Sequence, residues 1–178
     1  MKILIVIAVV VLSGCSGIDV STYQGNVPRF DLFTYFLGET KGWGMVQDRQ
    51  GRMIRQFVVD IDGRVDPQGN LMLTEDFDWS DGEKSSRVWI ISRTEEGGIV
   101  GNADDVVGEA TGRSAGNVLQ WKYYLLVEVD GRTWKVALDD WMFLQPDEVL
   151  INRTKMSKFG FDLGEVTIVF AKPGSFER

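Results

Sequence analysis

The sequence predicts an all-β fold, either an antiparallel sandwich or an up-and-down barrel, preceded by one short helix. After Gly42, turn-forming residues recur at short intervals, at 50–51, 62–63, 66–70, 80–83, 95–98, 113–117, 130–131 and 162–165. The runs between them are rich in Val, Ile, Trp, Phe and Tyr, and they often alternate apolar with polar residues. Short strands joined by tight turns are typical of these two folds.

The first 14 residues have the layout of an export signal. A positive charge at Lys2 precedes the apolar run 3–12, and the small residues Ser13-Gly14 follow it. This run is too short to span a bilayer, because a membrane-spanning helix needs about 20 apolar residues. We therefore interpret residues 1–14 as a signal peptide.

Cys15 is the only cysteine of the chain and comes directly after this leader. The stretch 12–15, Leu-Ser-Gly-Cys, resembles the lipobox of bacterial lipoproteins, in which the thiol receives diacylglycerol and the chain is cut before it. The resemblance implies attachment of several acyl chains at Cys15, and Ser16 in the next position implies the periplasmic face of the outer membrane. An ordinary signal peptide with an incidental cysteine is the alternative interpretation.

Charge and composition exclude several classes of protein. The chain has 19 basic and 26 acidic residues, and its formal charge of −7 becomes −8 when Lys2 leaves with the leader. This balance is unfavourable for binding nucleic acid or anionic headgroups. A lone cysteine allows no internal disulfide, and the lack of histidine excludes a Ser-His-Asp triad and a His-based zinc site. We expect neither an enzyme nor a bound cofactor or metal.

One short helix is predicted near the N-terminus. The stretch 29–38, "RFDLFTYFLG", has apolar residues at helical spacing, with Asp31 suited to cap its start and Gly38 its end. We expect residues 15–28 to form an acylated tether and residues 29–178 to form a single domain.

Two hairpins can be placed in register from their apolar patterns. A two-residue turn at 130–131 predicts the pairs Val127 with Trp134, Leu125 with Val136, Tyr123 with Leu138 and Trp121 with Asp140. A three-residue loop at 80–82 predicts the pairs Leu71 with Ile91, Leu73 with Trp89, Glu75 with Arg87 and Phe77 with Ser85. In both hairpins the apolar faces match.

A few charged residues share these apolar faces. Glu75 faces Arg87, Asp140 lies on the apolar face of its hairpin, and Arg55 lies on another mainly apolar strand face. One interpretation is a buried ion pair that fixes strand register. The other is a lumen whose apolar wall takes an acyl chain while polar groups orient its head. The sequence leaves both open.

Two carboxylate doublets, Asp104-Asp105 and Asp139-Asp140, are each predicted to diverge to opposite faces of a strand. Such divergence excludes a shared-proton dyad.

Nine short stretches together resemble a family of short Gram-negative lipoproteins known only as a domain of unknown function. They are "FDLF", "GWG", "LTEDF", "DG", "RVWII", "ADDVVGEATG", "DDWM", "INRTKMSKFG" and "EVTIVF", and the resemblance covers about residues 30–170. It implies an antiparallel up-and-down, lipocalin-like β-barrel, but no activity. True lipocalins carry Gly-x-Trp on the first strand, whereas here Gly42 and Trp43 are adjacent.

We therefore expect an outer-membrane-anchored periplasmic lipoprotein that binds or handles a lipid, such as a fatty acid or phospholipid, or another apolar small molecule. A side-chain-filled barrel that assists envelope assembly through a protein partner is the alternative, and an enzyme acting on lipids comes third. The expected lumen residues are Leu73, Phe77, Trp89, Trp121, Tyr123, Leu125, Val136 and Leu138, with Arg55, Glu75, Arg87 and Asp140 as its polar groups.

Overall fold

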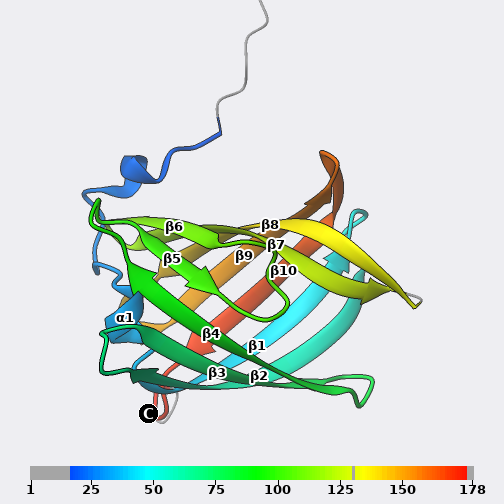
Figure 1. The fold of residues 1–178 in the computed structure, drawn as a ribbon, viewed down its shortest axis with the longest axis horizontal. Helices are drawn as coiled ribbons and strands as arrows, with labels where there is room; N and C mark the ends of the chain where they lie inside the picture. Colours follow the sequence, from blue (N-terminus) through cyan, green and yellow to red (C-terminus); the bar gives the residue numbers. More distant parts are fainter. Residues whose placement is uncertain (1–16, 130, 176–178) are drawn as a thin grey trace, which may run out of the picture.

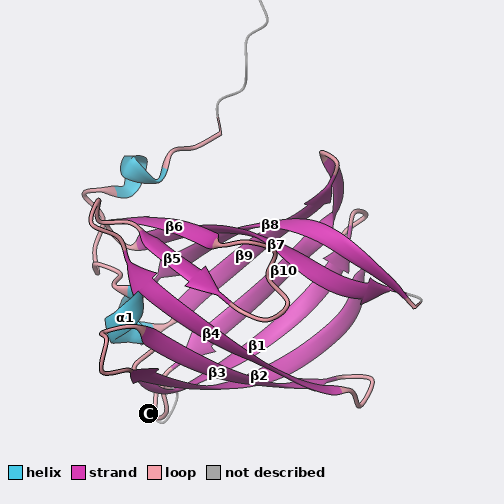
Figure 2. Cartoon of the chain, viewed as in Figure 1, coloured by secondary structure: helices cyan, strands magenta, loops and turns pink. Residues whose placement is uncertain are grey.

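A computed structural model describes residues 17–129 and 131–175 of the chain. The predicted signal peptide, lipobox and Cys15 lie outside these residues. Strands make up most of the described chain, and helices are confined to three short segments (Figure 2). No helix in the described part is long and apolar enough to cross a membrane.

In the described part of the chain, ten antiparallel strands form a closed barrel, so the structure is the barrel and not the sandwich (Figure 1). Each strand pairs with the next along the chain, and β10 pairs with β1 to close the sheet. The strands are β1 (Gly38–Asp48), β2 (Met53–Val65), β3 (Leu71–Trp79), β4 (Lys84–Arg93), β5 (Ile99–Asn102), β6 (Ala110–Ala115), β7 (Val118–Val129), β8 (Arg132–Leu144), β9 (Leu150–Lys158) and β10 (Phe161–Ala171).

Both predicted hairpin registers are confirmed. In β7 and β8, Val127 pairs with Trp134 and Trp121 with Asp140, and in β3 and β4, Glu75 pairs with Arg87. The turn glycine Gly82 has a φ of 87°, in the left-handed region that a glycine adopts without strain. These registers were predictable because a slip of one residue would turn every apolar side chain to the outside.

One end of the barrel is covered by the chain that precedes β1. Asp31 caps the single helical turn α1 (Leu32–Tyr35) by accepting a 2.8 Å hydrogen bond from the backbone N–H of Thr34. The buried ring of Phe36 then packs edge-on against Phe170 of β10, with ring centroids 5.5 Å apart. This packing buries apolar side chains across the end of the barrel from which β1 starts.

The segment expected to be a tether is partly packed on the barrel. Val20 lies in the 3-10 helix η1 (Val20–Tyr23) and is buried with Ala115 and Val118. Tyr23 makes edge contacts with the rings of Trp141 and Phe143 on β8. The chain from Val20 onward is therefore attached to the barrel rather than a free linker.

Two of the expected turns, at 62–63 and 162–165, instead lie inside strands. Asp62-Gly63 is within β2, where a Cβ on Gly63 would overlap the carbonyl oxygen of Phe36. Gly164 lies within β10 beside a register shift, with a φ of 146°, and a Cβ there would overlap the carbonyl oxygen of Gln47. These glycines allow close backbone approach and a bulge instead of a chain reversal.

Asp104 and Asp105 lie in the loop between β5 and β6, contrary to the prediction of a strand. Asp139 and Asp140 do lie on β8, where Asp139 accepts a hydrogen bond from Gln120 and Asp140 is buried. The remaining short helix, η2 (Pro146–Glu148), joins β8 to β9.

Candidate functional site

A cavity of about 480 Å³ lies inside the barrel. Of the twelve lumen residues expected from the sequence, eleven line it, and Val136 is buried without lining it. The eleven are Arg55, Leu73, Glu75, Phe77, Arg87, Trp89, Trp121, Tyr123, Leu125, Leu138 and Asp140. The volume falls within the range of about 300–1,000 Å³ that is typical of small-molecule sites.

The cavity is closed near α1 and exposed at the opposite end. Phe36, Leu119 and Phe170 line the α1 end, and each is at most 5% exposed. Ile54 and Val129, which adjoin the β1–β2 and β7–β8 turns, also line the cavity and are 63% and 44% exposed. The lumen is therefore a blind pocket whose entrance lies among these turns.

Aromatic side chains form much of the apolar wall. The Trp89 ring lies edge-on to Trp121 and Tyr123, with centroids 5.8 and 5.4 Å away. Phe57 packs against Phe77 nearer the entrance, with centroids 5.5 Å apart. Rings placed edge-on keep their own packing and still offer apolar surface to the lumen.

A first cluster of polar side chains in the cavity wall comes from β3, β4 and the β5–β6 loop. Arg87 Nη1 lies 3.7 Å from Glu75 Oε2, so the pair predicted from sequence is present. Arg87 also donates to Asp105, with an Nη2–Oδ2 distance of 2.7 Å. Burial raises the pKa of Glu75 to about 7, against the opposing attraction of Arg87.

Asp105 was not predicted to line the lumen, because the sequence analysis placed Asp104 and Asp105 on a strand and not in a loop. The only available signal was its place in a loop rich in Asp and Gly, which does not indicate where a side chain will point.

A second cluster of polar side chains in the cavity wall comes from β7, β8 and β9. Asp140 is 4% exposed and accepts hydrogen bonds from the side chains of Tyr123 and Thr154. Asn152, which is 3% exposed, donates from Nδ2 to the Thr154 hydroxyl at 3.2 Å. Burial raises the pKa of Asp140 to about 7, although these hydroxyl donors oppose the shift.

Asn152 and Thr154 were not predicted to line the lumen. Their signal was the alternation of Leu150, Asn152, Thr154 and Met156 on one face of β9. Without a tight turn to fix the pairing of β8 with β9, that face could not be assigned to the inside.

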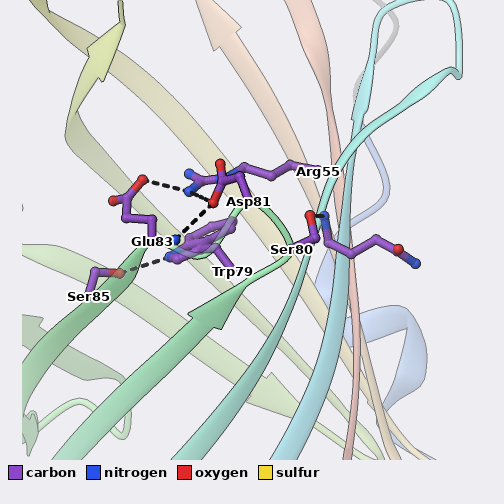
Figure 3. A network of polar contacts seen from close by, with 7 residues as sticks. Arg55, Trp79, Ser80, Asp81, Glu83 and Ser85 are labelled. Carbon is purple, nitrogen blue, oxygen red and sulfur yellow. Dashed lines mark hydrogen bonds and ion pairs between the residues drawn. The ribbon is translucent and has the colours of Figure 1, made fainter.

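Arg55 lies at the entrance instead of deep in the lumen (Figure 3). Its guanidinium stacks on Trp79, with Cζ 3.9 Å from the ring centroid. The same group binds Asp81 at 2.7 Å and Glu83 at 2.6 Å, both in the β3–β4 turn. The Trp79 indole donates to Ser85 at 2.9 Å, so the platform under Arg55 is itself held in place.

The arrangement suits binding of an apolar molecule that carries a polar end. Within residues 17–129 and 131–175, no group of three or more His, Cys, Asp or Glu side chains is placed to hold a metal ion. The apolar wall and the two polar clusters provide shape and orientation for a ligand.

Comparison with known proteins places the chain in a family. No curated protein matches the sequence. Residues 9–172 match the family described as "Protein of unknown function (DUF3833)", in agreement with the resemblance noted from its short motifs. Because the match covers nearly the whole chain, this protein belongs to the DUF3833 family.

Proposed function

We propose that this protein is a lipoprotein anchored to the periplasmic face of the outer membrane through Cys15. We further propose that its barrel binds a lipid or another apolar small molecule in the manner of a lipocalin. The leader and the lipobox-like stretch 12–15 support the anchor. The cavity of about 480 Å³ is the single observation that carries the binding proposal.

The apolar character of the cavity favours a ligand with a hydrocarbon part. Burying methylene groups against such a wall contributes about 0.8 kcal/mol for each group. Burial of some ten carbons would thus contribute about 8 kcal/mol before the entropic cost of association, and micromolar affinity corresponds to roughly −8 kcal/mol. A pocket that is closed at one end encloses such a chain. The chain would enter between the turns at the open end.

Binding can be measured without detergent on a chain that begins at Ser16. Every described helix and strand lies within residues 17–175, so this anchor-free chain keeps the whole barrel. We expect a neutral fluorescent probe such as N-phenylnaphthylamine to bind it with micromolar or tighter affinity. Native mass spectrometry of the same chain should reveal a co-purified lipid.

A matched pair of variants distinguishes the lumen from the outer surface. Leu125 lines the cavity, whereas its neighbour Leu126 is 43% exposed. Leu125→Trp should fill the cavity and weaken probe binding by ~10-fold or more, and Leu126→Trp should leave it unchanged. Equal effects of the two variants, or no binding of any apolar probe to the wild type, would reject the proposal.

A further inference from the structure

Two hydrogen-bond acceptors in the cavity wall have no partner among the described residues. They are Oδ1 of Asp140 and Oδ1 of Asn152. Both side chains line the cavity and are more than nine-tenths buried. Buried polar atoms are rarely left without a partner in native structures, and such exceptions call for an explanation, for example an unseen water or ligand.

The surrounding hydrogen bonds fix which atoms remain free. The Thr154 hydroxyl donates to Asp140, so its oxygen accepts from the amide Nδ2 of Asn152. That bond directs Nδ2 to Thr154 and leaves Oδ1 of Asn152 as the free atom. Tyr123 donates to the same carboxyl group of Asp140. When Asp140 is ionised, the free positions of this cluster are therefore both acceptors.

The cations of the cavity wall are already matched by carboxylates. Within residues 17–129 and 131–175, the charged residues that line the cavity are two arginines and four acids: Arg55, Arg87, Glu75, Asp105, Glu128 and Asp140. Arg87 binds Glu75 and Asp105, and Arg55 binds two acids of the β3–β4 turn. An anionic head would have to displace these partners and enter a lumen with more acids than bases.

We propose that the cavity selects ligands whose polar end donates hydrogen bonds, such as a hydroxyl, amide or ammonium group, and that this end binds Asp140 and Asn152. This inference rests on the proposed function and narrows its ligand class. A hydroxyl or ammonium group fills the free acceptor positions, whereas an ionised carboxylate has no proton to donate. The bond to Asp140 is charge-assisted when that carboxyl group is ionised.

The test compares ligands with one tail and different heads. Decanol, decylammonium, decyl methyl ether and decanoate would each compete with N-phenylnaphthylamine for the anchor-free chain at a pH above 8, because Asp140, whose pKa is raised to about 7, is then ionised. We expect decanol and decylammonium to bind ~10-fold or more tightly than the ether and decanoate. The ether is the decisive control for decanol, because it keeps the oxygen acceptor and lacks only the donor.

Three variants locate the effect. Asn152→Leu should reduce the preference for decanol over the ether, because one acceptor is lost. In Asp140→Asn, the amide oxygen accepts from Tyr123 and Thr154 and the amide N–H₂ takes the free position, so the preference should shift toward the ether. Met156→Leu, which changes an apolar lining residue on the same strand face as Asn152, should leave the preference unchanged.

The outcomes separate this inference from the proposed function. Binding of decanoate or the ether as tightly as decanol rejects a donor head but keeps the apolar pocket. Failure of every decyl compound and of the probe to bind rejects the proposed function, and the inference falls with it. The wild-type comparison decides the matter even where a variant fails to fold.

Discussion

Arg87 of β4 binds both carboxylate oxygens of Asp105, with Nε 3.1 Å from Oδ1 and Nη2 2.7 Å from Oδ2. β4 pairs with β5 only from Ile90 to Arg93, so its earlier half has no strand partner on that side. The β5–β6 loop takes this place, since the backbone N–H of Leu126 on β7 bonds to the carbonyl of Asp105. The ion pair thus joins β4 to β7 through the loop and completes the barrel wall.

Loss of Arg87 should destabilise the protein more than loss of an outer ion pair. Arg87→Met leaves Glu75 and Asp105 close together without a counter-ion, which should lower the free energy of unfolding by ~2–3 kcal/mol after allowance for partial exposure. Arg153→Met, which breaks the exposed 2.9 Å pair with Glu165, should cost less than about 0.5 kcal/mol. Urea denaturation measures both, and equal losses would contradict a structural role for the Arg87 pair.

Stability should fall as the pH rises from about 5 to about 7.5. Burial raises the folded-state pKa of both Glu75 and Asp140 to about 7, from ordinary values of 4.5 and 3.8. Between these values the folded chain retains protons that the unfolded chain releases, so a higher pH favours unfolding. The shifts correspond to a loss on the order of 2 kcal/mol for each group.

Asp140→Asn should remove about half of this pH dependence, because the amide does not titrate. Denaturation midpoints across the pH range, for the wild type and for the variant, provide the measurement. A stability that increases between about pH 5 and 7, or a slope unchanged in the variant, would show that burial does not hold these carboxyl groups neutral.

The sequence was most informative where a tight turn joins two strands of alternating character. The pairing of Glu75 with Arg87 followed from a three-residue turn and matching apolar faces. Asp105 was missed because its position depends on a loop that folds against β7, and no periodic pattern describes such a loop. Asn152 and Thr154 were missed because their register is transmitted through β8 instead of a tight turn.

Gly63→Ala should test the reason for a glycine in the middle of β2. Its Cβ would overlap the carbonyl oxygen of Phe36, so either α1 or β2 must move. We expect a loss of ~1–3 kcal/mol in the free energy of unfolding, as for other overpacked sites. Gly25→Ala is the control, since nothing lies within 4 Å of a Cβ there. Wild-type stability of Gly63→Ala would mean that the α1 end is loosely packed.

Cys15→Ser should prevent lipid attachment, because the chain has no other thiol. We expect an unprocessed precursor or a soluble periplasmic form in place of the membrane-bound mature protein. Fractionation of cells, with protein size determined by mass spectrometry, is the measurement. A variant of mature size that still fractionates with the outer membrane would contradict anchoring through this residue.

The packing of η1 on the barrel limits the orientation that the molecule can take at a membrane. Val20 is buried against Ala115 and Val118, at the β6–β7 turn, on the same end of the barrel as α1 (Figure 1). Val20 follows Cys15 by five positions, and a fully extended chain over five positions reaches about 18 Å. With the proposed acyl chains on Cys15, this short connection keeps the closed end of the barrel next to the bilayer. The entrance then faces the aqueous periplasm, so a ligand would be exchanged with carriers in solution and not directly with the membrane that holds the protein.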